Sequence, residues 1–548
     1  MSWRISGGLS CPFVSAAYAN EAGTPWYDPT KPQSRLLYID KNSLYPEAMS
    51  MPLPIGGYES LPLDENDDWN VDSVENLLED FDAMGDVGYF LRIDYVIPQH
   101  EHDLMDFAPI SKMHVPWSEL SQRQQLKAEN KLHQQWLVEW ERKHPGVTPP
   151  EHTVSEPRSA NAVKKLVCWM GKHIDEGLTL AHVQLLRRLF DIEITKVYSI
   201  WKFKQASWAK PFIDDVSKRR AACTNELDKN CLKLTMNGNY GKLLQNQLTQ
   251  TSAVLYTDPE AWQRAVWRKN YKDSDIVCYD ENRGDFLAWC TTRKKKAVEL
   301  TTLRLQGLVT LEWSKMLMLE LHYDVIKQQF GRAAVLDATD TDSKIYHITL
   351  TEKVLKGLDM QDLDPEKITM YDVLNVMNQK SPMFDLSKCD NKELKRKCPY
   401  KGRIGFAKLE VGYDDSGAWQ TLVAFLGAQA KMYALLIKQQ CIDRVTAQMD
   451  QVVKMKAKGL PTRMLEKTFG WSDYEDAIYH SLSRRLKFRM MRPRNHVVEH
   501  LETSKIGITS NNEKVFQIGP RNCRCLGHYK NYLPGAETED AEELWKKQ

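Results

Sequence analysis

The chain is 548 residues long, 42% hydrophobic and 10% aromatic, which is the composition of a globular protein with sizeable cores. Its formal net charge of +1 at pH 7 gives no overall sign of a polyanionic partner. No apolar stretch is long enough to span a bilayer, the N-terminus lacks the layout of a signal peptide, and an odd number of cysteines, 11, argues against a disulfide framework. These features predict a protein without a membrane partner in a reducing intracellular compartment, the nucleus or the cytoplasm.

Charged residues are unevenly distributed along the chain. Acidic residues concentrate at 64–82, and basic runs lie at 218–220, 293–296, 392–403 and 484–494. A protein with no net charge can still hold DNA in a basic channel when its positive charges are clustered in this way. Each basic run taken alone, however, is more simply explained as solvated surface. The last run interleaves Phe488 with its cations and is the best candidate of the four for contacts to a nucleic-acid backbone.

The first predicted element is a short buried strand, Leu36 to Ile39, that ends at Asp40. Residues 43–46 turn away from it, and Pro and Gly mark a loop at 51–58. A predicted insertion at 60–205 contains a strand at 88–98, a polar helix at 118–144 and a Pro-rich loop at 145–159.

A long helical pattern follows at 213–246, and mixed strand signals occupy 250–308. Residues 301–330 predict a helix with an almost continuous apolar face. An apolar segment, the polar turn 339–343 and an alternating strand at 345–350 come next, and together they predict a β-hairpin with carboxylates at its tip.

Three groups of residues could carry chemistry, and the first begins at Asp40. An Asp at the end of a buried strand is a well-oriented ligand for a hard cation, and Tyr45, just beyond it, could lie flat beneath a bound sugar. An equally good interpretation of this segment alone is an Asp that caps the helix after the strand.

The second group is the turn that holds Asp340 and Asp342. Two acids in so short a turn repel each other by several kcal/mol in a dry setting of effective dielectric near 20, and a bound Mg²⁺ would remove that cost. A solvent-exposed turn would carry no such cost, but the flanking apolar strands argue against free exposure and favour a functional site.

The third group lies on the helical pattern. At about 100° per residue, five side chains fall within about 80° of one another: Arg219, Lys229, Lys233, Asn237 and Tyr240. A stripe of cations facing a cleft suits a triphosphate, because Lys and Arg can meet the β and γ oxygens, and the ring of Tyr240 could stack on a base or ribose. Glu226 on the same stripe keeps a solvated amphipathic face open as an alternative.

Together the three groups supply what nucleotidyl transfer needs. In that reaction two carboxylates hold two cations about 3.5–4 Å apart, one activating the 3′-OH and one neutralising the leaving pyrophosphate. A basic helix then orients the incoming triphosphate.

Four segments resemble, in order, the motifs of family B DNA polymerases. DKNSLYPEAM (40–49) resembles motif A, KLTMNGNYGK (233–242) motif B, TDTDS (339–343) motif C, and KMY (431–433) the later KxY motif. ISGG (5–8) is similar to the linker of the protein-primed branch, and further segments look like viral sequences of the Polinton or adintovirus type. Bacteriophage, adenovirus and linear-plasmid polymerases belong to the same branch. The resemblance covers nearly the whole chain.

The resemblance implies a metal site and a sugar gate. Asp40 and Asp342 match the two metal-binding carboxylates, with Asp340 as an accessory acid and the Lys41 carbonyl as a backbone ligand. Tyr45 matches the steric gate that excludes a 2′-OH. The implied cofactors are two Mg²⁺ ions, with Mn²⁺ as an alternative.

The resemblance also implies nucleotide and DNA contacts. Lys233 matches the triphosphate lysine, Asn237 and Tyr240 the nucleotide pocket, and Lys229 a supporting cation. Lys431 and Tyr433 match the pair at the primer terminus, and Gly7 and Gly8 match the glycines of the linker, which we expect to contact DNA. The implied partners are primer-template DNA, dNTPs, a terminal protein as primer and a separate exonuclease subunit.

The implied fold is an α+β, discontinuous right hand with an antiparallel palm, helical fingers and a small thumb. We expect six segments: linker and palm with motif A (1–59), an insertion resembling terminal-protein region 1 (60–205), fingers with motif B (206–250), an insertion resembling terminal-protein region 2 (251–308), palm with motif C and KxY (309–460), and thumb (461–548).

The chain departs from the family pattern at several positions. Gly238 replaces a Ser in motif B, at a cost to the helix of up to about 1 kcal/mol. Ala338 stands where motif C normally has Tyr, and Ile5 stands in for the Tyr of the linker. Only 39 residues precede Asp40, so we expect no 3′–5′ exonuclease domain in this chain. The exonuclease would be encoded separately, or the chain would be a relic.

Two alternatives stay open on the sequence alone. A polymerase that copies or makes RNA could use a similar palm, although the DTDS turn and Tyr45 favour DNA synthesis. A decayed or domesticated polymerase-like protein could bind DNA without catalysis. The intact acids at 40, 340 and 342 argue against decay, whereas Ala338 leaves room for it.

Overall fold

The computed structural model describes the chain at 6–61, 71–144, 146–150, 163–280, 285–295, 297, 302–439, 450–494 and 497–537. Within the sequence interpretation, Ile5, the acidic residues 64–70, Pro145, residues 151–159 and Lys296 lie outside these ranges. The chain divides into two compact units: Met1–Asn237 with Val309–Arg484 and Gly507–Gln548, and Gly238–Leu308 with Arg485–Ile506. Within the described ranges, no helix combines the length and apolarity needed to cross a membrane.

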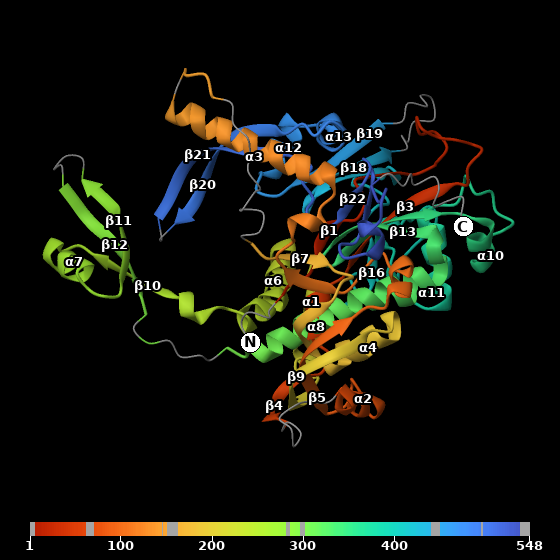
Figure 1. Ribbon diagram of the computed structural model, residues 1–548, viewed down its shortest axis with the longest axis horizontal. Coiled ribbons are helices and arrows are strands. Elements are labelled where there is room, and N and C mark those ends of the chain that lie inside the picture. The colour runs from red at the N-terminus through yellow and green to blue at the C-terminus, as the bar shows by residue number, and fades with distance from the viewer. Residues whose placement is uncertain are drawn as a thin grey trace. The chain divides into compact units, whose positions relative to one another are not determined.

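A six-stranded sheet forms the centre of the first unit (Figure 1). Its strands, in spatial order, are β1 (Ser10–Pro12), β13 (Ala334–Asp340), β14 (Ser343–Thr349), β3 (Ser34–Lys41), β16 (Ala407–Leu409) and β15 (Phe384–Asp385). Neighbours are antiparallel except β15 and β16. The predicted strand before Asp40 and the predicted hairpin around 339–343 are both confirmed, and the mixture of helices and strands confirms the α+β class.

A second, four-stranded sheet packs against the first. It consists of β19 (Asp450–Ala457), β18 (Met432–Gln439), β17 (Gln420–Gln429) and β2 (Ala16–Tyr18). Leu36 and Ile345 from the first sheet join Phe425, Leu435 and Ile437 from the second in one buried cluster. Each such side chain contributes roughly 1.5–3 kcal/mol on burial, so this core fixes the strands that end at the carboxylates.

A third sheet lies in the region of the predicted insertion. It consists of β4 (Leu53–Ser60), β9 (Glu193–Ala206), β5 (Val87–Val96) and β8 (His173–Thr179). The strand predicted at 88–98 is confirmed as β5, but the loop predicted at 51–58 is wrong beyond Pro52. The pairing of β4 with β9 skips residues next to Gly56, and Gly56 and Gly57 have φ of 140° and 66°, so these glycines form bulges within a strand.

Most helices follow the sequence signals. The helix predicted at 118–144 is α3 (Gln122–Lys143), which begins at a capping box of Ser121 and Gln124. The helix predicted at 301–330 runs as α8 (Arg304–Glu320), a π-helical stretch (Leu321–Lys327) and α9 (Gln328–Phe330). The remaining helices of the first unit, apart from the two after β9, are α1 (Leu44–Met49), α2 (Val71–Glu79), α4 (Leu180–Phe190), α10 (Glu352–Gly357), α11 (Met370–Lys380), α12 (Thr462–Thr468) and α13 (Trp471–Tyr479).

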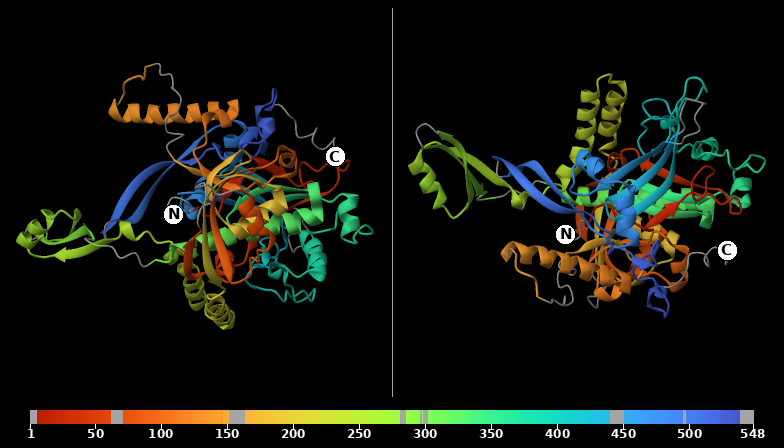
Figure 2. Two further views of the ribbon diagram at one scale, coloured as in Figure 1. Left: turned by 60° about the horizontal axis from the view of Figure 1, so that its bottom comes forward. Right: turned by 90° about the horizontal axis from the view of Figure 1, so that it is seen from above.

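The single helix predicted at 213–246 is wrong. The chain forms two helices, α5 (Lys210–Ala222) and α6 (Glu226–Leu243), which lie side by side in both views of Figure 2. Cys223 is extended, with ψ of 136°, and the side chain of Asn225 accepts from the Leu227 N–H at 2.9 Å. A side chain that satisfies a free N–H in this way starts a new helix, so Arg219 does not share a helix with Lys233.

The second unit holds a three-stranded sheet and a long hairpin. Its elements are β10 (Thr251–Tyr256), β12 (Asp285–Lys294), β11 (Tyr271–Asp280), α7 (Pro259–Val266), β20 (Arg484–Arg494) and β21 (Val497–Ile508). The strand signals predicted within 250–308 are thereby confirmed. Two smaller two-stranded sheets of the first unit pair β6 (Ile110–Met113) with β7 (Lys165–Cys168) and β22 (Phe516–Ile518) with β23 (Asn522–Arg524). The six functional segments stay a prediction.

Candidate active site

Asp40 and Asp342 are brought together by the pairing of β3 with β14. In the register of these strands Ser343 lies opposite Asp40, and the Lys41 N–H donates to the Asp342 carbonyl oxygen at 2.7 Å. The two acids come from distant parts of the sequence, and the antiparallel ladder places them at the same end of the sheet.

The surroundings of both carboxylates disfavour negative charge. Burial first, and then the charge of Asp342, raises the pKa of Asp40 to about 7. Burial also raises the pKa of Asp342, with a further contribution from Asp340. A bound cation would relieve this cost, since an opposite charge close to a carboxylate favours its ionised form.

The two simpler interpretations of these acids are not supported. The helix after β3 begins with Ser43 as its N-cap, so Asp40 does not cap it. Asp340 and Asp342 are both half-buried, so the turn between β13 and β14 is not a freely solvated acidic loop. Both findings favour a functional role for the pair.

The turn that holds Asp342 has a strained backbone, held by the N-terminal segment. Thr341 has φ of 67°, which is unusual for a β-branched residue. Its N–H donates to the Leu9 carbonyl at 2.7 Å, and β1 pairs with β13 so that Ser10 lies opposite Asp340. A Cβ atom on Gly8 would stand 2.6 Å from Thr341 Cγ2. Gly8 is therefore needed for the close approach of the two segments.

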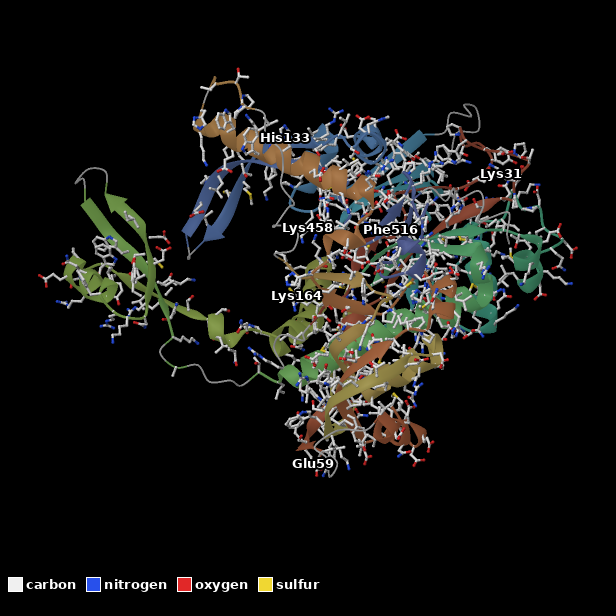
Figure 3. The ribbon with its side chains drawn as sticks, in the orientation of Figure 1. Lys31, Glu59, His133, Lys164, Lys458 and Phe516 are labelled. Atoms are coloured by element: carbon white, nitrogen blue, oxygen red, sulfur yellow. The ribbon has the colours of Figure 1, made fainter. Side chains whose placement is uncertain are left out.

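Lys431 and Tyr433 lie beside the same turn. Lys431 Nζ is 2.5 Å from Asp340 Oδ1, and the Tyr433 hydroxyl is hydrogen-bonded to Tyr38. The backbone of Lys431 has φ of 58° and accepts from the N–H of Lys458, which Figure 3 labels, at 3.1 Å. The predicted primer-terminus pair is thus adjacent to the predicted acids, whereas its contact with a primer stays a prediction.

Ala338 is buried next to this pair. It belongs to the cluster that joins the two sheets, and it borders a cavity of about 20 Å³ that Lys431 and Tyr433 also line. So small a cavity cannot hold a phenol ring, because even one extra methylene is felt in a packed core. The tyrosine that motif C normally carries at this position would require local repacking.

The structure brings Lys233, but not every member of the predicted cationic stripe, to the acids. Lys233 is exposed, and its charge acts on both Asp40 and Asp342, lowering the pKa of each against the larger effect of burial. Lys229 instead pairs with Glu226 at 2.8 Å. Of the other residues on α6, Asn237 is exposed, and Tyr240 falls within the second unit.

Arg219 does not belong to the stripe. It lies on α5, where its Nε is 2.9 Å from Asp215 Oδ2 one helical turn away. An exposed pair of this kind contributes little to stability, typically about 0.3–0.5 kcal/mol. The assignment of Arg219 to one helical face with Lys233 is wrong, because the helix breaks between them.

Lys41 and Tyr45 flank the turn after β3. The Lys41 ammonium is buried and lies 3.2 Å from Glu47 Oε2, so a contact of Lys41 with a metal would have to come from its carbonyl. Tyr45 is the second residue of α1 and is half-buried. Gly7 is half-buried too, with nothing within 4 Å of the position of a Cβ. Their predicted contacts stay predictions.

The sequence interpretation missed Glu410. The N–H of Glu410 donates to the Tyr38 carbonyl at 3.0 Å, its carboxylate accepts from Lys408 Nζ at 2.7 Å, and its charge helps to raise the pKa of Asp40. Lys408 lies opposite Asp40 in the pairing of β16 with β3. The alternation of apolar and charged residues from 407 to 410 was the available signal.

The site offers few protein ligands for a divalent cation, but those it offers are of the right kind. Carboxylates and a backbone carbonyl are the oxygen ligands that Mg²⁺ prefers. Among the described residues, however, no three His, Cys, Asp or Glu side chains form a metal-ligand group, and Lys431 engages Asp340. The fit therefore rests on Asp40, Asp342 and the Lys41 carbonyl, with other ligands coming from water or substrate.

Comparison with known proteins adds weak structural similarity. No family model and no curated protein sequence matches the chain. Among solved structures it is similar to "Phi29 DNA polymerase complexed with primer-template DNA and incoming nucleotide substrates" (TM-score 0.45, 13% identity, 92% of this chain and 61% of that chain). It is also similar to the same enzyme in a "post-translocation binary complex" with primer-template DNA (TM-score 0.43, 14% identity, 91% and 60%). The chain thus spans about three fifths of those chains.

Proposed function

We propose that the chain is a DNA polymerase that adds dNTPs to a 3′-OH under the direction of a template. The observation that carries the proposal is the meeting of Asp40 and Asp342 at the end of one sheet, within the electrostatic reach of Lys233. A pair of acids whose pKa values are raised by burial, with a cation opposite, suits a reaction in which metal ions and a triphosphate bring charges of both signs.

Each residue then has a defined task. Bound divalent cations, Mg²⁺ or Mn²⁺, would supply activation of the 3′-OH and neutralisation of the leaving pyrophosphate. Asp40, Asp342 and the Lys41 carbonyl hold them, and Lys233 orients the triphosphate. Tyr45 lies under the sugar and excludes a 2′-OH.

The remaining assignments follow the motif order. Asn237 and Tyr240 complete the nucleotide pocket, and Lys229 supports the triphosphate lysine. Lys431 and Tyr433 meet the primer terminus once DNA replaces Asp340 as the partner of Lys431, and Gly7 and Gly8 border the DNA.

The proposal also assigns a role to each part of the chain and a place in genome replication. The six-stranded sheet serves as the palm, α5 and α6 as fingers, and the C-terminal part as thumb. The insertions at 60–205 and 251–308 engage a terminal protein and support strand displacement, in the replication of a viral or mobile-element genome that is primed by a protein. Support for this branch comes from the motif order and the linker glycines, 7 and 8.

Primer extension with the full chain tests the proposal. Wild-type protein with Mg²⁺ should extend a DNA primer on a DNA template, and Asp40→Asn and Asp342→Asn should reduce the rate by at least about 10³-fold. Asp362→Asn, at an exposed position between α10 and α11, is the matched control. Wild-type rates in either active-site variant would refute the assignment.

Two further results would select the alternatives. Salt-sensitive DNA binding by the wild type without any incorporation would identify a non-catalytic DNA-binding protein. Preferred use of an RNA template or of rNTPs, measured by competition, would identify a different polymerase.

A further inference from the structure

A strongly basic segment lies next to the candidate active site and has no role in the proposal above. Residues 388–403, called the basic loop here, contain seven Lys or Arg residues and two acids. The loop connects β15 with β16, the strand beside β3. The proposed chemistry of Asp40 and Asp342 does not explain this charge.

Most cations of the basic loop face solvent and have no carboxylate partner within the described ranges. Five of them are exposed and form no ion pair with any carboxylate in the part of the chain that the structure describes: Lys392, Lys395, Lys397, Lys401 and Arg403. Many exposed cations elsewhere do have such partners, as Arg219 has in Asp215. Uncompensated charge at this density is an electrostatic footprint for a polyanion.

The loop itself is ordered by internal contacts. Asp390 Oδ1 accepts from the Cys398 N–H at 2.6 Å, and the backbones of Asn391 and Arg396 exchange two hydrogen bonds of 2.9 Å. The Arg396 guanidinium lies over the ring of Tyr371 at 4.4 Å. The Arg403 guanidinium lies over the ring of Phe406 at 4.8 Å. Two arginines thus have aromatic partners, whereas the exposed lysines of the loop form no ion pair among the described residues.

Asp385 ties the loop to the strand that carries Asp40. Its carboxylate accepts from Asn42 Nδ2 at 2.9 Å and from the Gly402 N–H at 2.7 Å. The Asn42 backbone also bonds to both Gly405 and Phe406 at 2.9 Å. Three residues span at most about 11 Å, so the end of the basic loop lies within that distance of the turn after Asp40.

We propose that the basic loop binds the phosphate backbone of the DNA at the Asp40 site. The inference rests on the proposed function for the place of the DNA. Exposed cations along an irregular loop can meet successive phosphates without reading sequence. An acidic protein partner would be expected to add an apolar contact core, and the only exposed large hydrophobic side chain among the described residues of this loop is Leu394.

The test compares two double variants of equal charge change. Lys397→Gln/Lys401→Gln removes two loop cations, and Lys353→Gln/Lys356→Gln removes two exposed lysines of α10. The equilibrium Kd for a labelled primer-template duplex is measured by anisotropy in the absence of divalent cations between 50 and 200 mM salt, a range of about fourfold that resolves counterion release.

The loop variant should bind about tenfold more weakly at the lower salt, and the slope of log K against log salt should fall by about 1.8, which corresponds to two lost phosphate contacts. The control and Lys397→Arg/Lys401→Arg should keep the wild-type slope. Equal losses in the loop variant and the control would overturn the proposal. So would tighter binding of the loop to an acidic polypeptide such as polyglutamate than to the duplex, which would assign it to a protein partner.

Asp40→Asn separates this inference from the proposed function. That variant should lose extension but keep wild-type Kd and salt slope, whereas the loop variant should keep its extension rate at saturating DNA. If Asp40→Asn extends normally while the loop variant still loses affinity, the polymerase proposal fails and the loop remains a DNA-binding surface. If the loop variant binds normally, the loop proposal alone fails.

Discussion

Gly8 and Thr341 approach so closely that a Cβ atom on Gly8 would stand 2.6 Å from Thr341 Cγ2. Thr341 separates Asp340 from Asp342 and has a positive φ of 67°. The contacts of the N-terminal segment with Thr341 thus help to hold the turn between Asp340 and Asp342 in its strained conformation.

Gly8→Ala should therefore disturb catalysis more than DNA binding. The added methyl group forces the Thr341 turn to move, at about 1–3 kcal/mol, and we expect the extension rate at saturating DNA to fall about tenfold or more. Gly7→Ala is the matched control, since nothing lies within 4 Å of its Cβ position. If Gly8→Ala instead changed only the Kd for DNA, the glycine would act as a DNA contact, as the resemblance implies.

Asp40 should make the protein less stable as the pH rises. Burial raises the pKa of folded Asp40 to about 7 from 3.8, so the folded state binds more protons than the unfolded state between these values. The stabilising contribution is then complete below about pH 4 and is lost as the pH rises through 7.

Asp40→Asn removes this dependence. Without divalent cations, its Tm should exceed that of the wild type by about 1–3 °C at pH 8, with a much smaller difference at pH 5. Calorimetry checks this, and Asp362→Asn should follow the wild type at both pH values. A lower Tm for Asp40→Asn at pH 8 would contradict the raised pKa.

Divalent cations should stabilise the folded protein by offsetting the unfavourable burial of the two carboxylates, Asp40 and Asp342. At pH 8 and ten times its Kd, Mg²⁺ should stabilise the wild type by about 1.4 kcal/mol, because the ion binds the folded carboxylates. At pH 6 the affinity should be about tenfold lower, since Asp40 must release a proton first. Asp40→Asn and Asp342→Asn should lose the effect in thermal unfolding titrations, whereas a persistent effect in both would place the ion elsewhere.

Glu410 should tune the pH dependence of the reaction. Its negative charge helps to raise the pKa of Asp40, so Glu410→Gln should lower that pKa and move the acidic limb of the pH–rate profile down by about half a unit. Glu352→Gln, an exposed acid on α10, should leave the profile unchanged. A shift to higher pH would show that the lost partner of Lys408 matters more than the lost charge.

Tyr45 should govern sugar selection. Tyr45→Val removes the ring that we place beneath the sugar, and rNTP incorporation relative to dNTP should rise about a hundredfold. The comparison uses kcat/KM for both nucleotides on one template. Tyr58→Val, an exposed tyrosine on β4, should keep the wild-type ratio. Unchanged selectivity in Tyr45→Val would remove the gate role.

The strand before Asp40 and the hairpin at 339–343 were predictable because each is marked by a local pattern of apolar and turn residues. Their meeting was predicted from the resemblance and is confirmed by the pairing of Ser343 with Asp40. The meeting of the acid pair could therefore be predicted from the resemblance, whereas the ion pair of Lys431 with Asp340 was not predicted.

Other features depend on contacts that no local pattern records. The strand β4 forms where Pro and Gly predicted a loop, because β9 pairs with it across Gly56 and Gly57. Glu410 reaches Asp40 only through the pairing of β16 with β3. Single-sequence patterns miss such cases because tertiary pairing overrides local preference. The break at 223–225 is different, since the Asn225 side chain that accepts from the Leu227 N–H is a local signal that the prediction overlooked.

The central place of β3 has a consequence for how the molecule matures. Asp40 leaves the ribosome well before its ladder partners on β14 and β16, which lie some three hundred and more residues later in the chain. Contacts between residues so far apart in sequence form slowly, since closing a large loop costs chain entropy before the contact stabilises the fold. During synthesis β3 therefore lacks its ladder partners, and the two proposed metal-binding acids can meet only after the segment containing Asp342 has been made.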